Sequence, residues 1–244
     1  MNVNKVVLVT GGTRGIGEAI VRKFASLNYD VIFNYVNSDN KALELKDELE
    51  GKYNINILPI KADLANEVNI NNMFKTISNN YSHIDVLVNN AGIAFDSVLE
   101  DKTKDSFMHV LDVNLVAPFL ISKKVKEYMD KGSIINISST NGIDTYYPYS
   151  MDYDVSKAGL NSLTKNFAVL YAPNIRVNAV APGWVNTDMN KELDKEIIAE
   201  ETKKVLLNRF AEPSEIANVV AFLASDDASY INGEIIRIDG GFYG

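Results

Sequence analysis

The apolar run VVLVT at Val6–Thr10 passes directly into the glycine-rich stretch GGTRGIG at Gly11–Gly17. A short run of Val and Leu is typical of a buried strand, and Ile16, Ile20 and Phe24 then recur every four residues, as on one face of a helix. A strand, a glycine-rich turn and a helix in this order place backbone N–H groups and the positive end of the helix where a pyrophosphate can bind. A tight turn without a ligand is the alternative, and the position at the first strand–helix junction argues against it.

Apolar runs rich in Val, Ile, Leu and Phe recur along the whole chain and alternate with longer amphipathic segments. Near-continuous apolar runs are typical of parallel strands that are covered on both faces. The predicted strands are Lys5–Thr10, Asp30–Tyr35, Asn56–Lys61, Ile84–Asn89, Ser133–Ser138, Ile175–Val180 and Glu234–Asp239. The alternation predicts one α/β domain over residues 1–244, a doubly wound, seven-stranded parallel sheet with helices on both faces and right-handed crossovers. The polar segment Asn186–Asn208 is expected to be either a mobile lid or a fixed surface helix.

The composition excludes several kinds of site and partner. The chain of 244 residues has no cysteine, which excludes disulfides, thiolate metal sites and a cysteine nucleophile. Its only histidines are His83 and His109, so a multi-histidine metal site is excluded and no metal site is predicted. The net charge of −8 argues against a nucleic-acid partner, which needs a basic face. The N-terminus has no signal segment and no apolar run approaches the roughly 20 residues of a membrane span, so we expect a soluble, cytoplasmic protein without a membrane partner.

Tyr153 and Lys157 lie four residues apart in a segment with helical spacing, and therefore on one face of the helix. A free phenol has a pKa of about 10, too high for proton transfer near neutrality, and a nearby ammonium favours the phenolate and lowers that pKa. The pair could therefore act as a general acid/base, and an ordinary amphipathic helix with a surface lysine is the alternative. The strand that ends in Ser138 and Ser139 supports the first interpretation, because ligands bind at the carboxyl ends of strands in open α/β sheets. Capping or turn hydrogen bonds are the other role open to these serines.

Further motifs follow the glycine-rich stretch in order. They are Asp63-Leu64, Asn89-Asn90-Ala91-Gly92, Asn114, Ser139, Tyr153 with Lys157, and Pro182-Gly183 followed by Thr187. Together with the Thr-Gly-x3-Gly-x-Gly spacing that begins at Thr10, they resemble the short-chain dehydrogenases/reductases over the whole chain. The resemblance implies a Rossmann-like fold, an enzyme that moves a hydride between NAD(P)(H) and a carbonyl or alcohol, and a homotetramer.

The resemblance also implies a catalytic set of Asn114, Ser139, Tyr153 and Lys157. In the reduction that it implies, Ser139 hydrogen-bonds the carbonyl oxygen, where negative charge develops, and Tyr153 delivers the proton to that oxygen. Lys157 lowers the pKa of Tyr153 and holds the nicotinamide ribose, and Asn114 anchors a water that links Lys157 to solvent. The cofactor carries the hydride chemistry and the protein positions it.

The cofactor-binding set that the motifs imply runs from the first turn to the residues after the sixth strand. It comprises Gly11, Thr13, Arg14, Gly15, Ile16, Gly17, Asn34, Ser38, Asp63, Leu64, Asn90, Ala91, Gly92, Tyr153, Lys157, Pro182, Gly183, Val185 and Thr187.

The end of the second strand bears on which nicotinamide is bound. A carboxylate there usually bonds the ribose 2′-hydroxyl of NAD, but the corresponding residue is Tyr35, and Asp39 comes late. The 2′-phosphate of NADP is then permitted, and Arg14 can contact it as a charged fork while Ser38 adds a hydroxyl. NADP(H) is therefore favoured. NAD(H) stays open, because Asn37 stands where many NADP-dependent members of the family have an arginine.

The C-terminal part, Arg209–Gly241, resembles the 3-oxoacyl-carrier-protein reductase branch of the family. That resemblance implies an acyl-thioester substrate and acyl carrier protein as a partner. A small free ketone, sugar or polyol is the alternative, because the loop at residues 144–152 is large, aromatic and acidic, and Lys131 is the only basic residue where an acidic carrier would dock. The tyrosines of this loop either line the substrate pocket or cover the loop; they are Tyr146, Tyr147 and Tyr149. A nucleotide-binding regulator without catalysis would have a broken Ser/Tyr/Lys set, and here the set is intact.

Overall fold

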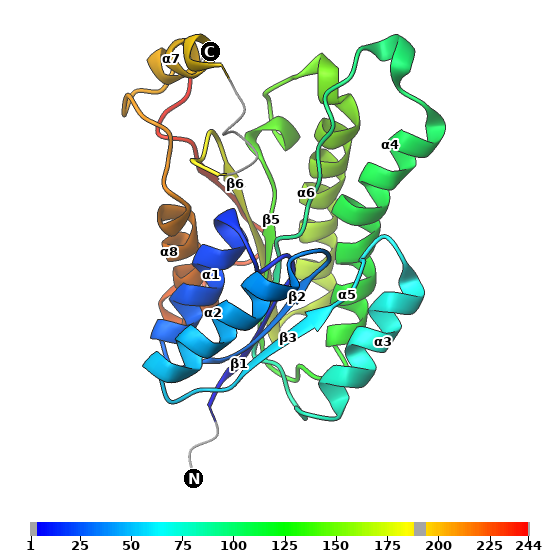
Figure 1. Ribbon diagram of the computed structural model, residues 1–244, viewed down its shortest axis with the longest axis vertical. Coiled ribbons are helices and arrows are strands. Elements are labelled where there is room, and N and C mark those ends of the chain that lie inside the picture. Colours follow the sequence, from blue (N-terminus) through cyan, green and yellow to red (C-terminus); the bar gives the residue numbers. More distant parts are fainter. Residues whose placement is uncertain (1–3, 188–193, 244) are drawn as a thin grey trace.

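The computed structural model describes residues 4–187 and 194–243 and has a parallel sheet at its centre (Figure 1). The strands are β1 (Val6–Val9), β2 (Asp30–Tyr35), β3 (Ile57–Lys61), β4 (Val86–Asn89), β5 (Gly132–Ile137), β6 (Ile175–Pro182) and β7 (Ile235–Ile238). They form a 7-stranded sheet in the order β3-β2-β1-β4-β5-β6-β7, and every neighbouring pair is parallel. The predicted Rossmann-like sheet is confirmed. The observed strand ends differ from the predicted ones by up to two residues, since ladder hydrogen bonds and not hydropathy define them.

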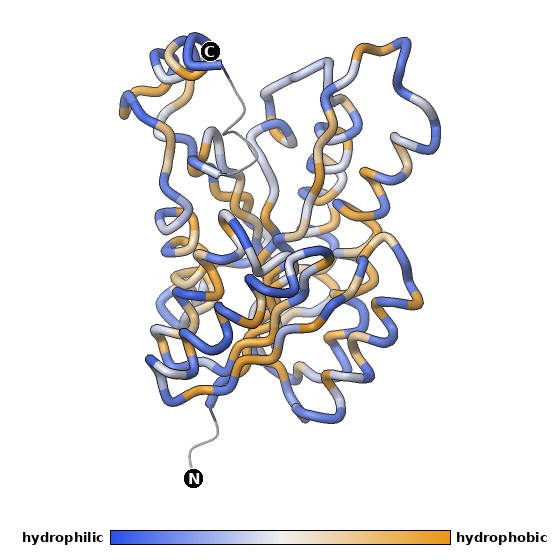
Figure 2. Tube along the Cα trace, viewed as in Figure 1, coloured by the Kyte–Doolittle hydropathy of each residue, from blue (hydrophilic) through white to orange (hydrophobic). Residues whose placement is uncertain are grey.

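Helices cover both faces of the sheet, as predicted (Figure 1). They are α1 (Gly15–Ser26), α2 (Asp39–Lys52), α3 (Glu67–Ser78), α4 (Lys104–Leu111), α5 (Ala117–Val125), α6 (Met151–Tyr171), α7 (Lys195–Lys203) and α8 (Pro213–Ala224). The helices α1, α2 and α8 pack on one face, and α3, α5 and α6 pack on the other. Figure 2 shows the resulting pattern, with hydrophobic residues along the strands and polar residues on the outer sides of the helices. No helix within the described ranges combines the length and apolar character needed to cross a membrane.

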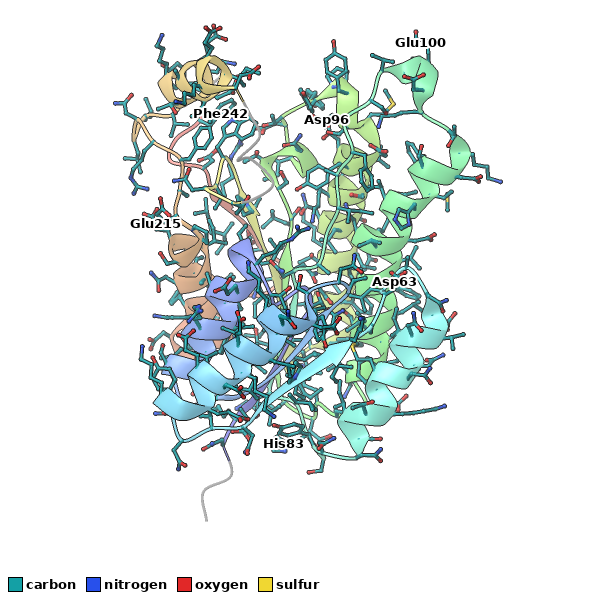
Figure 3. The ribbon with its side chains drawn as sticks, viewed as in Figure 1. Asp63, His83, Asp96, Glu100, Glu215 and Phe242 are labelled. Atoms are coloured by element: carbon teal, nitrogen blue, oxygen red, sulfur yellow. The ribbon has the colours of Figure 1, made fainter. Side chains whose placement is uncertain are left out.

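The carboxyl ends of the parallel strands all point toward one end of the molecule. His83, which precedes β4, lies at the opposite end, whereas Asp96, which follows β4, lies near this one (Figure 3). From β1 the chain builds the sheet outward through β2 and β3, and it then returns to add β4 on the other side of β1. The connections after β1 and β4 therefore diverge at this edge, which is where ligands bind in open α/β sheets.

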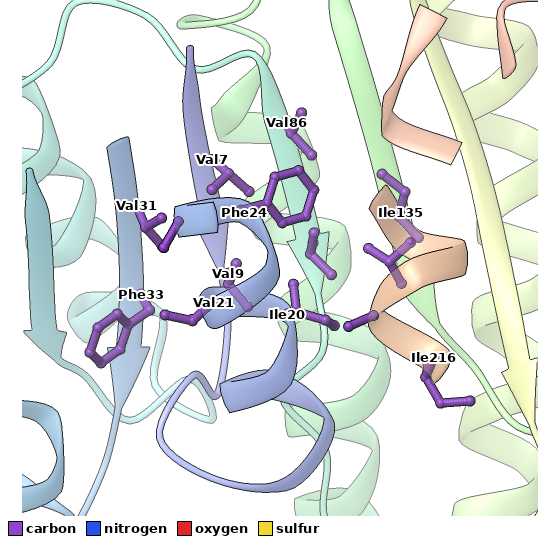
Figure 4. Close-up of a cluster of buried hydrophobic side chains, with 14 of the residues drawn as sticks. Val7, Val9, Ile20, Val21, Phe24, Val31, Phe33, Val86, Ile135 and Ile216 are labelled. Carbon is purple, nitrogen blue, oxygen red and sulfur yellow. The ribbon is translucent and has the colours of Figure 1, made fainter. Parts of the chain in front are cut away.

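Side chains alternate along β1 and divide the core into two layers. Val7 and Val9 point toward α1, where they meet Ile20 and Phe24 (Figure 4). Val6 and Leu8 point to the other face, and all four residues of β1 are buried. The helix face that the four-residue spacing predicted is the buried one, and its packing fixes the glycine-rich turn at the carboxyl end of β1.

The polar segment Asn186–Asn208 contains the surface helix α7, while residues 188–193 of this segment lie outside the described ranges. α7 begins at Lys195 and keeps no residue fully buried. Of the two structures expected for this segment, the surface helix is present over Lys195–Lys203. The mobile lid stays a prediction.

Candidate active site

The glycine-rich turn between β1 and α1 is supported by Asn34 of β2. Gly11 and Gly15 have φ of +67° and +54°, in the left-handed region that favours glycine. Oδ1 of the buried Asn34 accepts a hydrogen bond from the Gly11 N–H at 2.8 Å, and Nδ2 donates to the carbonyl oxygen of Ala62 at 2.8 Å. Asn34, predicted as a cofactor ligand, thus uses both ends of its amide to fix the turn.

The other side of the turn rests on the segment that follows β4. Asn90 Nδ2 donates to the carbonyl oxygens of Thr10 at 2.8 Å and of Gly11 at 3.1 Å. The backbone N–H groups of Asn90 and Ala91 both donate to Thr10 Oγ1 at 2.9 Å. A Cβ on Gly17 would overlap the Gly11 carbonyl oxygen and the Asn90 amide, so only glycine lets α1 approach this closely.

The start of α1 has the features that a phosphate group requires. Arg14 is the N-cap residue, its backbone is extended, and it makes no side-chain capping bond, so no side chain of this residue covers the first N–H groups of the helix. A Cβ on Gly15 would come within 3.3 Å of Thr187, and one on Gly92 would come within 3.5 Å of Lys157 Nζ. Glycine at both places keeps side-chain bulk out of the path from α1 toward Lys157. The predicted residues therefore fit a dinucleotide.

An ion-paired cluster lies at the end of β2. The Tyr35 hydroxyl donates to Asp39 Oδ1 at 3.1 Å, and Lys61 Nζ, at the end of β3, donates to Asp39 Oδ2 at 2.7 Å. The hydrogen bond from Lys61, followed by that from Tyr35, lowers the pKa of Asp39. Asp39 follows the usual carboxylate position in the sequence, and the structure nevertheless places its carboxylate at this strand end. Lys61, which the sequence analysis did not select, compensates its charge. Arg14 is exposed and makes no ion pair within the described ranges.

The residues predicted on the adenine and ribose side differ in exposure. Asp63 is exposed (Figure 3), and its Oδ1 accepts a hydrogen bond from a backbone N–H two residues later at 3.0 Å. Leu64 and Thr13 are buried at 4% and 7% exposure. Ser38 is the N-cap residue of α2 without a side-chain capping bond, and Ile16 packs at the edge of the core. The hydroxyl of Ser38 and the carboxylate of Asp63 are the groups of this set that remain accessible.

Ser139, Tyr153 and Lys157 come together from two elements. Ser139 follows β5, and the other two lie in the first two turns of α6. The hydroxyl of Ser139 lies close enough to the phenol of Tyr153 to lower its pKa, and Ser139 Oγ donates a hydrogen bond to Asn141 Oδ1 at 3.1 Å. Lys157 is 3% exposed; its Nζ lies 5.4 Å from the centroid of the Tyr153 ring and donates to the carbonyl oxygen of Ile137 at 2.7 Å. The structure thus brings together the three side chains that the sequence pattern selected.

Burial governs the ionisation of Tyr153 and Lys157. Burial lowers the pKa of Lys157 from 10.5 to about 8. Burial also raises the pKa of Tyr153 above its ordinary 10.0, the neighbouring Ser139 hydroxyl opposes that increase, and the charge of Asp154 adds to it. The sequence predicted that the ammonium would lower the pKa of Tyr153; in the structure burial raises this pKa, and Ser139 is the group that opposes the increase. The arrangement favours a neutral phenol, which can donate a proton.

Asn114 lies in a π-helical segment, Asp112–Val116, between α4 and α5. Its Oδ1 accepts from the N–H of Ile93 at 2.8 Å, and its Nδ2 donates to the carbonyl oxygen of Ile93 at 2.8 Å and to Ser156 Oγ at 3.1 Å. A π turn inside a helix shifts the direction of the side chains that follow, and such turns are frequent at functional sites. These bonds join the segment after β4 to α6, next to Lys157. The water-anchoring role of Asn114 stays a prediction.

The residues predicted on the nicotinamide side follow the end of β6 at Pro182. A Cβ on Gly183 would come within 2.8 Å of Asp239 Cβ, which explains the glycine there. Val185 is buried at 4% exposure and forms a parallel bridge with the strand-like segment at Ala211. The N–H of Thr187 donates to the carbonyl oxygen of Val185 at 2.8 Å. This turn directs Thr187 toward Gly15 of the phosphate turn.

Trp184 joins the end of β6 to α7. Its ring stacks on Phe210 with centroids 5.3 Å apart and planes at 11°. Its Nε1 donates to Glu201 Oε2 on α7 at 3.1 Å, and the same carboxylate accepts from Lys204 Nζ at 2.6 Å. Sequence reasoning did not select any of these residues, since they are far apart in the chain.

The loop between β5 and α6 is fixed by Asp154. Its two carboxylate oxygens accept from Asn141 Nδ2 and from the N–H of Tyr147, each at 2.8 Å. Tyr147 and Tyr149 pack edge to face with centroids 5.6 Å apart, yet they remain 44% and 52% exposed. Tyr146 is 82% exposed. Both interpretations of these tyrosines, as pocket lining or as loop cover, therefore remain open.

Comparison with known proteins identifies the family. A family model described as enoyl-(acyl carrier protein) reductase matches residues 11–243. The 3-oxoacyl-(acyl-carrier-protein) reductase FabG of Aquifex aeolicus is 42% identical over 98% of this chain and 97% of its own length. A solved short-chain dehydrogenase/reductase from Serratia marcescens has a TM-score of 0.93 at 35% identity and covers 98% of both chains. This chain belongs to the short-chain dehydrogenase/reductase family. A second solved structure, a blue fluorescent protein from a metagenomic library in complex with NADPH, has a TM-score of 0.93 at 35% identity over 100% of both chains.

As a short-chain dehydrogenase/reductase, the chain is an NAD(P)-dependent oxidoreductase. The family model begins at Gly11 of the phosphate turn and extends past β7, so it includes every predicted site residue. The Ser/Tyr/Lys set of this member is intact and assembled in space, which argues against a regulator that has lost catalysis.

Proposed function

We propose that this short-chain dehydrogenase/reductase reduces a 3-oxoacyl thioester to the 3-hydroxyacyl thioester, with NADPH as the reductant and Tyr153 as the proton donor. The observation that carries the proposal is the convergence of Ser139, Tyr153 and the buried Lys157 at the carboxyl end of β5, with Lys157 Nζ 5.4 Å from the centroid of the Tyr153 ring. Two neighbouring hydroxyl groups can both donate hydrogen bonds to one substrate oxygen atom, which suits a carbonyl substrate. The relative named as a 3-oxoacyl-(acyl-carrier-protein) reductase supports the thioester as that substrate.

The proposed cofactor site uses the phosphate turn and the end of β2. The start of α1 would hold the pyrophosphate, and Arg14 and Ser38 would hold the 2′-phosphate. When bound, the cofactor supplies the hydride. NADPH is preferred in this proposal because Tyr35 occupies the usual carboxylate position and Lys61 compensates the charge of Asp39. The NADPH complex of a structurally similar protein supports the choice.

The proton in the proposed reaction is held on the phenol of Tyr153. Because burial raises the pKa of this group, the phenol is neutral at physiological pH and can pass its proton to the substrate oxygen. Ser139 Oγ lies next to it and would donate a second hydrogen bond to the same oxygen, where negative charge develops. Lys157 Nζ, with a pKa of about 8, can gain or release a proton near neutrality and is suited to restoring the phenol afterwards. Asn114 holds the adjacent segment in place through Ile93.

A second candidate is reduction of a small free ketone, sugar or polyol by the same residues. The loop at residues 144–152 favours it, since Tyr146 is largely exposed and Asp144 is held by Arg237 through two bonds of 2.7 and 2.8 Å. Lys131 is the only basic residue at the positions where an acidic carrier protein would dock. With such a substrate, acyl carrier protein would not be a partner.

The test is the steady-state rate with an acetoacetyl thioester, followed by the loss of reduced nicotinamide with NADPH and NADH in parallel. We expect turnover with NADPH and a lower kcat/KM with NADH. Tyr153→Phe should lose about a hundredfold or more in kcat and still bind NADPH. Tyr230→Phe is the matched control, because its side chain is 102% exposed. Full activity of Tyr153→Phe would contradict the catalytic assignment, and bound NADPH without thioester turnover would redirect the search to small ketones, sugars and polyols.

We further propose that the chain assembles as a homotetramer. Phe119 of α5 and Leu170 of α6 are 42% and 70% exposed, which suits burial in an interface. Light scattering of the purified protein tests this, and a monomer at micromolar concentration would contradict it.

A further inference from the structure

A buried ion pair lies one residue before Tyr153. Lys102 Nζ donates to Asp152 Oδ1 at 3.0 Å and to Oδ2 at 3.1 Å. The side chains of Lys102 and Asp152 are only 5% and 1% exposed. By contrast, a surface pair such as Arg209 with Glu215 is 51% and 41% exposed. The burial of both charges sets the Lys102–Asp152 pair apart.

The remaining contacts of the pair go to the backbone. Lys102 Nζ also donates to the carbonyl oxygen of Phe95 at 3.2 Å, so all three donors of the ammonium are used. Asp152 Oδ1 accepts from the N–H of Tyr153 at 3.1 Å. The N-cap residue of α6, Ser150, makes no side-chain capping bond, and Asp152 therefore supplies the acceptor and the negative charge that the start of a helix favours.

Through these contacts the pair ties the start of α6 to the segment at residues 92–98, which follows β4. Asn114 fixes this segment near one end through its two bonds to Ile93, each 2.8 Å long. At the other end, the N–H of Ser97 donates to the carbonyl oxygen of Tyr149 at 2.9 Å. The pair holds the middle of the segment, which would otherwise have no anchor to α6 between these two points.

Stability alone gives little reason for a buried ion pair. The free-energy cost of removing two charges from water offsets much of their mutual attraction. Apolar side chains of similar volume at the same positions often give a protein of equal stability. Removing only one partner leaves an unpaired charge inside the protein, which is strongly unfavourable. The distinctive property of the Lys102–Asp152 pair is the identity of the atoms that it holds: the N–H of Tyr153 and the carbonyl oxygen of Phe95.

We propose that Lys102 and Asp152 are positioning residues, which fix Tyr153 at the start of α6 relative to the segment at residues 92–98. The inference rests on the proposed function of Tyr153 as the proton donor. Neither residue touches the reacting atoms. The pair acts on the reaction through the placement of Tyr153 and through the balance of charge beside it.

Because the pair carries two opposite charges, removing one of them should shift the pKa of Tyr153 in a predictable direction. The polar and ionisable groups next to Tyr153 are Ser139 from the end of β5, Lys157 and Asp154 from α6, and Asp152, whose carboxylate accepts from the Tyr153 N–H and is paired with Lys102. Lys102→Met would leave the carboxylate of Asp152 uncompensated, and a nearby negative charge disfavours the phenolate of Tyr153. Asp152→Asn would leave the ammonium uncompensated, and a nearby positive charge favours the phenolate. The two variants should therefore move the titration of Tyr153 in opposite directions.

The first measurement is an NMR titration of protein with tyrosines isotopically labelled at Cζ, with the Tyr153 signal assigned by its absence in Tyr153→Phe. We expect Lys102→Met to move the midpoint up and Asp152→Asn to move it down, each by about 0.3 units or more. The double variant Lys102→Met/Asp152→Asn should return it close to the wild-type value. Lys46→Met, which removes one partner of the surface pair with Glu50, is the control and should leave it unchanged. An unchanged midpoint in both folded single variants would overturn the inference.

The second measurement is kcat and KM of the same variants with the ketone that the wild type reduces. The double variant buries no unpaired charge, so it should fold even where a single variant does not. We expect its kcat to fall about threefold or more, because Phe95 loses its anchor to α6, with the KM for NADPH within about twofold of wild type. Wild-type kcat in the double variant would overturn the positioning role. A wild type that reduces no ketone, together with opposite shifts in the titration, would refute the proposed function and leave the coupling between the pair and Tyr153 intact.

Discussion

Replacing Lys157 by Met should make the protein more stable while it abolishes turnover. Lys157 is 3% exposed, and burial lowers its pKa from 10.5 to about 8. Each unit of pKa corresponds to about 1.4 kcal/mol, so holding the charged ammonium inside the protein at neutral pH costs about 3 kcal/mol. Methionine removes that cost and also removes the bond from Nζ to the carbonyl oxygen of Ile137, which contributes about 1 kcal/mol. The variant should therefore gain about 2 kcal/mol in the free energy of unfolding.

The pH dependence of this gain is the sharper part of the prediction. Between about pH 8 and pH 10.5 the unfolded chain holds a proton on Lys157 that the folded protein has released. The free energy of unfolding of the wild type therefore rises with pH across this window, and that of Lys157→Met lacks this rise. The advantage of the variant should be full below the folded pKa of about 8 and should vanish by about pH 10.5.

Urea unfolding at several pH values, followed by tryptophan emission, measures these differences. Lys165 lies on the exposed side of the same helix. The control variant Lys165→Met should therefore change the free energy of unfolding by less than about 0.5 kcal/mol. The reasoning would be refuted by a Lys157→Met protein that is less stable than the wild type at neutral pH. A gain that does not depend on pH would refute it equally, because the cost would then not arise from the charge.

Two further substitutions test the phosphate turn. Asn34→Ala leaves the Gly11 N–H and the Ala62 carbonyl oxygen without their buried partner, at about 1–3 kcal/mol each, so urea unfolding should show a loss of about 2–6 kcal/mol. The exposed Asn166→Ala should lose less than about 0.5 kcal/mol, and an equal loss in both variants would contradict the supporting role of Asn34. Arg14→Ala should raise the KM for NADPH by about tenfold to a hundredfold and leave the KM for NADH within about twofold. The same increase for both cofactors would show that this guanidinium does not contact the 2′-phosphate.

The sheet could be predicted because its strands are buried on both faces, so that hydropathy alone marks them. Asp30–Tyr35 has the same ends in the sequence interpretation and in the structure. The relation of Tyr153 to Lys157 was equally accessible, since four residues along a helix define one face whatever surrounds it. In the structure the two serines after β5 have different neighbours. Ser138 Oγ points to the carbonyl oxygen of Lys157 at 3.4 Å, whereas Ser139 meets the phenol of Tyr153.

Contacts between distant segments could not be predicted in this way. Lys61 reaches Asp39 only because the register of β2 and β3 pairs Tyr35 with Lys61, and no local pattern specifies a register. The direction of the Tyr153 pKa depends on how deeply the fold buries the phenol, which spacing does not reveal. The π turn at Asn114 likewise has no signature in composition. The Lys102–Asp152 pair joins residues fifty positions apart, and the sequence around each of them predicts only an exposed charged side chain.

The fluorescence of Trp184 reports on the contact between the end of β6 and α7. Trp184 is the only tryptophan of the chain, so its emission needs no correction for other indoles. Its ring stacks on Phe210 and its Nε1 donates to the carboxylate of Glu201, at the point where the end of β6 contacts α7. Any displacement of α7 from β6 must part the indole N–H from Glu201 and admit water, which shifts the emission to longer wavelength. Stopped-flow fluorescence on the unlabelled, unmodified chain therefore tests whether α7 moves when a ligand binds.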